Sequence, residues 1–217
     1  MIPPAKVLWP SPTPDPPNSA KGIQELEFYS KVDRTLGTPI NQTTVDEDNK
    51  RHATYLARMR IKDSDTSTVT LVKFAVKYNE VAHRLLAEHD PPIAPALYSC
   101  TCVIGDMFTV AMQYISASEG APLRGGSLPP PALEAVRRDI SQALKLLHRQ
   151  DFVFGDLQES NVLYSPEDGH ALLVDFDDVG RHGVDRYSAC LNPGAGLGVQ
   201  RLQIMEKSHD VENLKRL

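Results

Sequence analysis

Hydrophobic and polar positions alternate over much of the first half of the chain, and this pattern predicts strands. Period-two alternation at Thr54–Ile61 and a β-branched run at Thr68–Phe74 predict two strands joined by a polar turn. Apolar runs at Ala96–Ile104 and Met107–Ile115 predict a second pair, because the Gly105-Asp106 dipeptide between them is a hairpin signal. We therefore expect a unit rich in β-structure before residue 116.

Helical spacing is clearest in the second half. Apolar residues recur every three or four positions in Pro131–Arg149, which predicts a long helix. A second helix is expected at Tyr78–Glu88, ending before Asp90-Pro91-Pro92 because proline cannot continue it. Ile23–Val32 is predicted as a short helix with apolar residues on one side. Short strands are expected near Asn161–Tyr164 and Ala171–Val174.

Two segments have compositions typical of connections. Residues 1–22 hold seven of the seventeen prolines, so they lack the amide donors and apolar mass for a core and are predicted to be an extended arm. A Pro-rich docking ligand for a protein partner is the alternative for this arm. Residues 116–130 are rich in Gly, Ser and Pro and are predicted to be a hinge or linker.

Composition narrows the class of protein. With 217 residues and 41% hydrophobic content, the chain can form one modest domain or a two-lobed unit. The net charge of −5 argues against nucleic-acid binding, which needs a basic stripe. There is no apolar run of about 18 residues and no apolar leader, so we expect neither a membrane span nor secretion. Three cysteines without metal spacing fit a reduced, cytoplasmic or nuclear protein.

The most informative stretch is Phe152–Leu163, followed by Leu172–Asp177. Asp156 and Asn161 stand five residues apart between apolar runs, and Asp175 follows nineteen residues after Asp156. Any one of these could be a turn residue. Together they have the layout of a phosphotransfer site, in which one carboxylate orients or deprotonates a nucleophile while an amide and a second carboxylate hold Mg²⁺.

This stretch resembles the catalytic and metal-binding loops of the protein-kinase-like superfamily, in the Gly-Asp form found in small kinase-like proteins. The wider sequence, over about residues 68–217, is most similar to short fungal kinase-like proteins. The similar segments include Val72-Lys73-Phe74, Ala82–Ala87, Arg186-Tyr187 and His209-Asp210. The resemblance implies an α+β, two-lobed fold with a β-rich N-lobe at 23–115, a hinge at 116–130 and a truncated, mainly helical C-lobe at 131–217.

The resemblance also implies roles for individual residues. Lys73 would hold the ATP phosphates, braced by Glu80 on the following helix, with Glu88 as the fallback. Asp156 would be the catalytic base, Asn161 and Asp175 would bind Mg²⁺, and Asp210 would brace the catalytic loop. The adenine would lie against the segment after the last N-lobe strand: Met112, Gln113, Tyr114 and Ile115.

The chain departs from the usual motifs at several positions. Phe154 replaces the loop histidine, Gln158 stands where many kinases have a lysine, and Asp177 replaces the glycine of D-F-G. Asp177 could bind a second metal or lie in a solvated turn. No G-x-G-x-x-G precedes Lys73, and Leu36-Gly37-Thr38-Pro39 is a poor substitute.

The resemblance therefore implies an ATP- and Mg²⁺-dependent phosphotransferase with a protein or small-molecule hydroxyl acceptor. The missing glycine-rich loop and Gln158 favour an alternative, a pseudokinase that acts as a nucleotide-binding or partner-binding scaffold. A structural domain that binds no nucleotide is the third hypothesis.

Overall fold

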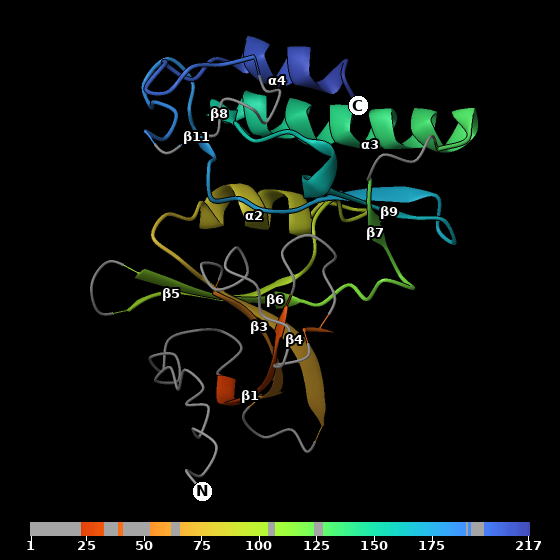
Figure 1. Ribbon diagram of the computed structural model, residues 1–217, viewed down its shortest axis with the longest axis vertical. Coiled ribbons are helices and arrows are strands. Elements are labelled where there is room, and N and C mark those ends of the chain that lie inside the picture. The colour runs from red at the N-terminus through yellow and green to blue at the C-terminus, as the bar shows by residue number, and fades with distance from the viewer. Residues whose placement is uncertain are drawn as a thin grey trace, which may run out of the picture.

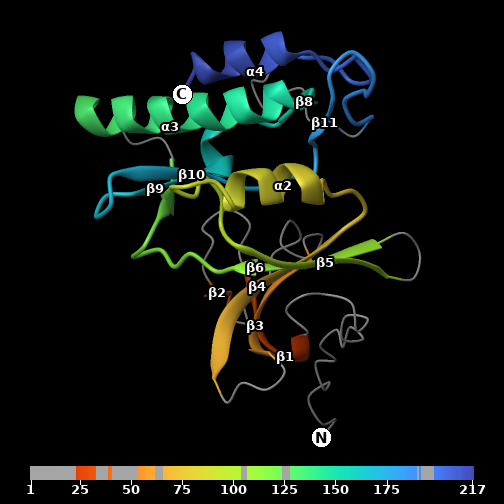
Figure 2. The same cartoon turned by 180° about the vertical axis from the view of Figure 1, so that it is seen from behind.

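The structure is a computed structural model, and it places a sheet at one end of the molecule and two helices at the other (Figure 1). A third helix, α2 (Glu80–Ala87), lies between them, and the reverse view shows the same three layers (Figure 2). The residues that the structure describes are 23–32, 39–40, 53–61, 66–103, 107–123, 128–189, 191 and 198–217. The predicted arm at 1–22, the Leu36-Gly37-Thr38 segment and the Gly105-Asp106 turn lie outside these residues.

The N-terminal sheet is antiparallel throughout and has the strand order β2-β1-β3-β4-β6-β5. The predicted strands are all present within a few residues of their expected ends. The strands are β1 (Ile23–Val32), β2 (Pro39–Ile40), β3 (Thr54–Ile61), β4 (Ser67–Ala75), β5 (Leu97–Val103) and β6 (Met107–Gln113).

The prediction of a helix at Ile23–Val32 is wrong, because this segment is strand β1. It pairs with β3, and the register shifts once between Ile23 and Glu25 and again between Phe28 and Ser30. A bulge places an extra residue in the strand and interrupts the period-two pattern. Phe28 is nevertheless buried, where it contacts Tyr55 and Phe74. The two bulges therefore gave this strand an apolar spacing that resembles that of a helix.

Helix α2 follows β4 directly. The Asn79 side chain caps it by accepting a hydrogen bond from the Ala82 amide at 3.0 Å. Ala82, His83 and Leu86 form its buried face, and Ala82 and Leu86 lie in the core cluster that also contains the buried residues of α3. This position lets α2 join the sheet to the helical lobe.

The second lobe is built on α3 (Pro130–Arg149), whose buried face includes Val136, Ile140 and Leu144. Two small antiparallel sheets pack near it, with orders β10-β9-β7 and β11-β8. The remaining elements are β7 (Ala121–Pro122), β8 (Phe152–Val153), the 3₁₀ helix η2 (Glu159–Asn161), β9 (Val162–Ser165), β10 (His170–Leu173), β11 (Gly180–Arg181) and α4 (Lys207–Leu214).

Part of the predicted linker is ordered against this lobe. Strand β7 lies within 116–130 and pairs with β9, and the amide of Leu123 donates to the Val162 carbonyl at 3.1 Å. Residues 124–127 of the linker lie outside the described residues. The chain therefore reaches the large lobe before α3 begins.

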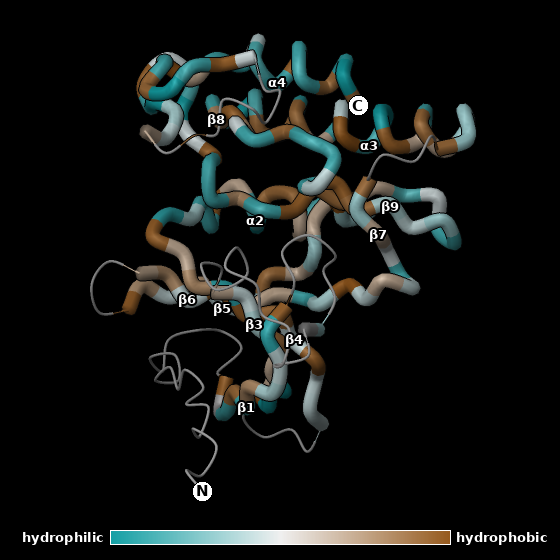
Figure 3. Tube along the Cα trace, viewed as in Figure 1, coloured by the Kyte–Doolittle hydropathy of each residue, from teal (hydrophilic) through white to brown (hydrophobic). Residues whose placement is uncertain are grey.

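Three hydrophobic clusters organise the described residues. One joins α2, β5 and β6 to α3 and the loops that follow it, and a second covers the opposite face of the sheet around Phe28, Met59 and Val72. The third contains Tyr187 and Met205. Figure 3 shows hydrophobic positions in the sheet strands and in both α2 and α3, the elements that supply the first two clusters. Among the described helices, none has the length and apolar character needed to cross a membrane.

Candidate active site

The loop that carries Asp156 is held by hydrogen bonds to a side chain of α4. The Asp210 carboxylate is fully buried and accepts hydrogen bonds from the amides of Phe154 at 2.8 Å and Gly155 at 3.0 Å. It also contacts His148 Nε2 at 2.9 Å, which ties in the end of α3. The structure thus gives Asp210 the contacts that were predicted for it, and buried backbone donors are satisfied by a side chain far along the chain.

Position 155 of this loop accommodates glycine and no residue with a side chain. Its φ is +84°, in the left-handed region that favours glycine. A Cβ here would lie 2.7 Å from the Asp178 carbonyl oxygen and 2.5 Å from Met205 Cε. The Gly-Asp sequence therefore follows from the close packing of the loop against residues 178 and 205.

Asp156 is buried and held by two amide side chains. Asn161 Nδ2 donates to Asp156 Oδ2 at 2.7 Å and to the Asp156 carbonyl at 2.8 Å. Gln158 Nε2 lies 3.0 Å and 2.9 Å from the two carboxylate oxygens. The structure therefore brings Asp156 and Asn161 together, and it adds Gln158, whose contact with Asp156 was not predicted from the sequence.

Opposing effects act on the protonation of Asp156. Burial raises the pKa of Asp156, and the nearby negative charge of Asp175 raises it further, while the hydrogen bonds from Asn161 and Gln158 lower it. The net shift is upward. A carboxylate with a raised pKa is a stronger proton acceptor for as long as it stays ionised.

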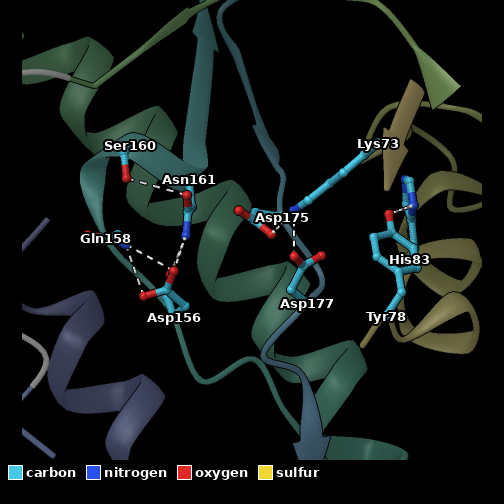
Figure 4. Close-up of polar contacts among 9 residues, drawn as sticks. All are labelled: Lys73, Tyr78, His83, Asp156, Gln158, Ser160, Asn161, Asp175 and Asp177. Carbon is cyan, nitrogen blue, oxygen red and sulfur yellow. Dashed lines mark hydrogen bonds and ion pairs between the residues drawn. The ribbon is translucent and has the colours of Figure 1, made fainter. Parts of the chain in front are cut away.

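Asp175 lies between the Asp156–Asn161 pair and Lys73 (Figure 4). It follows β10, and its φ of +70° is rare for a residue with a side chain. The amide of Val174 donates to the Asn161 carbonyl at 2.9 Å, so the two predicted metal-binding segments are directly joined. Unusual backbone conformations of this kind are concentrated at functional sites.

Lys73 reaches this cluster from near the end of β4. Its Nζ lies 2.7 Å from Asp175 Oδ1 and 2.7 Å from Asp177 Oδ2. Desolvation lowers the pKa of the Lys73 ammonium, but attraction to Asp175 and Asp177 outweighs it and raises the pKa overall. Lys73 is therefore charged and connects the small lobe to the segment after β10.

The prediction that Glu80 braces Lys73 does not agree with the structure. Glu80 Oε1 accepts from Arg84 Nε at 2.8 Å, one turn along α2. Glu80 is the first residue of the helix, where a partner at i+4 on the same face is close at hand. The fallback, Glu88, lies at the other end of α2 and is 3.9 Å from Arg84.

Aromatic packing fixes the segment that contains Asp175 and Asp177. Phe176 stacks on His83 of α2 with ring centroids 4.5 Å apart, and it meets Phe154 edge-on at 5.8 Å. The carbonyl of Phe176 also accepts from the Asn79 amide at 3.1 Å. Phe154, which replaces the usual histidine, thus fills a hydrophobic position against the segment that is predicted to bind metal.

The predicted adenine-binding segment lies at the end of β6. Met112 is buried in the core cluster that joins the lobes. The amide of Gln113 donates to the Ala96 carbonyl at 2.8 Å, and its side-chain Oε1 accepts from the Ala96 amide at 3.2 Å. The backbone N–H of Gln113 is thus already bonded to the residue before β5, so this N–H group cannot also bind an adenine edge. Tyr114 and Ile115 are both partly buried, and their role stays a prediction.

The donor set fits Mg²⁺, although the described residues include no group of three or more His, Cys, Asp or Glu side chains placed to hold a metal by themselves. Mg²⁺ bound with a nucleotide needs one or two protein ligands in addition to phosphate oxygens and water. Asn161 directs its Nδ2 to Asp156, which leaves its Oδ1 on the other side, 3.4 Å from Ser160 Oγ. Asp175 supplies a carboxylate, so the two residues offer the oxygen ligands that Mg²⁺ prefers.

Sequence reasoning missed two contacts of this site. The Gln158 contact had no signal beyond its position two residues after Asp156. The Asp177 contact had none either, because Asp175 has a left-handed φ of +70° and Asp177 lies in a turn, so the period-two rule for strands does not apply to this segment. Asp175 and Asp177 nevertheless share one partner, Lys73.

Comparison with known proteins places the fold. No protein-family model and no curated protein sequence matches the chain. Among the solved structures that match is the kinase PK-1 of Cydia pomonella granulovirus, with a TM-score of 0.54 and 17% sequence identity. The match covers 78% of this chain and 62% of the viral kinase, so the chain spans less than two thirds of that protein's length. The fold is α+β and kinase-like.

Proposed function

We propose that this protein is an ATP- and Mg²⁺-dependent phosphotransferase that acts on a hydroxyl group. One observation carries the proposal. Asp156, Asn161, Asp175 and Lys73 are drawn from separate segments of a kinase-like fold and meet in a single hydrogen-bonded and ion-paired group. An acid, an amide, a second acid and a lysine are the side chains that phosphoryl transfer in such folds requires.

Each side chain has a distinct task in this proposal. Asp156 orients the acceptor hydroxyl and takes its proton, and the two amides hold the carboxylate in place. Asn161 and Asp175 would hold Mg²⁺, which neutralises phosphate charge when bound. Lys73 supplies a fixed positive charge for the phosphates. The acceptor is a protein or small-molecule hydroxyl.

Ligand-dependent stability tests the nucleotide and metal part of the proposal. Mg·ATP at 100 times its dissociation constant should stabilise the protein by about 2.7 kcal/mol, because it binds the folded state alone. Asp175→Ala should abolish this gain, whereas Asp168→Ala, in the exposed turn between β9 and β10, should retain it. A melting temperature of the native protein that does not change with millimolar Mg·ATP would contradict nucleotide binding.

A second function, a pseudokinase scaffold, is favoured by one specific contact. Gln158 occupies both carboxylate oxygens of Asp156, the atoms that an acceptor hydroxyl would need. In a scaffold this contact would be permanent, and the cluster would serve stability or partner binding. Phosphoryl transfer in the native protein distinguishes the two functions, because a scaffold gives none.

A further inference from the structure

Lys73 is held by two carboxylates that come from the same short segment. Asp175 and Asp177 each lie 2.7 Å from Nζ, and the three side chains retain 19%, 23% and 31% of their exposure for Lys73, Asp175 and Asp177 respectively. Partly buried charges at this distance attract one another more strongly than exposed pairs, because water screens them less. One ammonium thus has two partners, both fixed to the loop after β10 (Figure 4).

The two carboxylates differ in their surroundings. Asp175 is joined through Val174 to Asn161 and lies toward Asp156, on the side proposed for the metal. Asp177 lies farther from that pair, and its Oδ1 is buried without a hydrogen-bond partner among the described residues. A buried carboxylate with one unsatisfied oxygen depends on the other oxygen for compensation, and here that oxygen contacts Lys73.

Glu80 is engaged elsewhere. Its carboxylate bonds Arg84 at 2.8 Å, and the Glu80 side chain retains 41% of its exposure. No contact between Glu80 and Lys73 is present in this part of the molecule. Besides Asp175, the acid that contacts the Lys73 head group is therefore Asp177.

We propose that Asp177 is the positioning residue for Lys73, and that it takes the part predicted for Glu80. The inference rests on the proposed phosphotransferase function. In this arrangement Asp175 can turn to a cation while Lys73 keeps one carboxylate partner and stays aimed at the phosphates. Asp177, which replaces the D-F-G glycine, then supplies the carboxylate that Lys73 would otherwise receive from Glu80, and Glu80 pairs with Arg84 instead.

Chemical labelling of Lys73 tests the inference without any nucleotide. An amine reacts with acetic anhydride only in its neutral form, so an ion pair slows the reaction. Asp177→Asn should speed acetylation of Lys73 by about tenfold, since a pKa lower by one unit gives about tenfold more neutral amine. The exposed Lys77, read by mass spectrometry in the same digest, provides the internal reference.

Two matched variants make this result specific. Glu80→Gln should leave the acetylation of Lys73 within about twofold of native, because it removes a pair with Arg84 and none with Lys73. Asp177→Glu, which keeps the carboxylate, should restore slow labelling at least in part. Asp177→Gly introduces the glycine of the usual motif, and it serves if Asp177→Asn does not fold.

Phosphoryl transfer then tests the role in the reaction. Asp177→Asn should lower the rate of phosphoryl transfer in the otherwise native protein. In a protein that already carries Lys73→Met it should have little further effect, since both changes remove the same positioned charge. Glu80→Gln should leave the transfer rate of either background unchanged.

The outcomes are separable. Faster Lys73 labelling in Asp177→Asn with normal labelling in Glu80→Gln supports the inference. Unchanged labelling in both Asp177→Asn and Asp177→Gly, or faster labelling in Glu80→Gln alone, overturns it. If the native protein transfers no phosphate, the proposed function fails, and the labelling result still decides which acid holds Lys73.

Discussion

At residue 155 the chain passes so close to its neighbours that a methyl group does not fit. The left-handed backbone costs a residue with a side chain about 1–2 kcal/mol, and contact with the Asp178 carbonyl oxygen adds to this. We therefore expect Gly155→Ala to lower the free energy of unfolding by about 3 kcal/mol or more. Urea denaturation measures this loss.

Gly169 provides the control for this prediction. Its φ is +67°, but a Cβ there would meet no atom within 4 Å. Gly169→Ala should therefore cost only the backbone penalty of about 1 kcal/mol. Equal losses at both positions would show that crowding at Gly155 is not important.

His83 gives the stability a pH dependence. Burial lowers the pKa of His83 from its usual 6.5 to about 4. The neutral ring donates from Nε2 to the Pro95 carbonyl at 2.8 Å and accepts at Nδ1 from the Tyr78 hydroxyl at 2.6 Å. Between pH 6.5 and 4 the unfolded chain binds a proton at this histidine and the folded protein does not. Stability should therefore fall as the pH drops through this window, by up to about 3 kcal/mol from this group.

Unfolding free energies between pH 7 and pH 4 test the role of His83. His83→Gln should flatten the dependence over this window even though it destabilises the protein at neutral pH. His182→Gln, at an exposed position, should leave the slope as it is in the native protein. A native slope that persists in His83→Gln would assign the dependence to other groups.

At the scale of elements, helix α4 positions the loop that carries Asp156 through one side chain. Asp210 accepts from two loop amides, and an amide side chain would offer them only one acceptor. Asp210→Asn should destabilise the protein by about 2–4 kcal/mol, and it should reduce phosphoryl transfer by displacing Asp156. Glu212→Gln, on the exposed side of the same helix, should change neither quantity measurably. Chemical denaturation and transfer assays of both variants check this.

The sequence predicted elements well where one pattern extended over the whole segment. The long helix α3 and the strands β3 and β4 have regular spacing and lie close to their expected bounds. Strand β1 was mistaken for a helix because its two register shifts break the alternation. Strand β7 has two residues, too few for any period, and only its pairing with β9 defines it.

At the scale of the whole molecule, motif spacing located the candidate site but not the pairing of its charges. Asn161 bonds Asp156, the segment of Asp175 is joined to Asn161 through Val174, and Asp210 bonds the loop before Asp156, an arrangement in which the spacing follows the loops of a kinase-like fold. The partner of Lys73 depends on how α2 packs against the segment after β10, and on Arg84 competing for Glu80. Such choices are decided by three-dimensional packing, which local sequence does not reveal.

The proposed phosphotransfer reaction depends most on Asp156 acting as its base. The direct test is phosphoryl transfer from Mg·ATP to hydroxyl-bearing peptides and small molecules by the native protein and by Asp156→Asn, with Mg·ATP affinity measured alongside. We predict transfer by the native protein and a loss of about 10²–10⁴-fold in the variant, the usual contribution of a general base, with affinity nearly unchanged. Transfer that Asp156→Asn does not reduce, or no transfer by the native protein above background, would contradict the account.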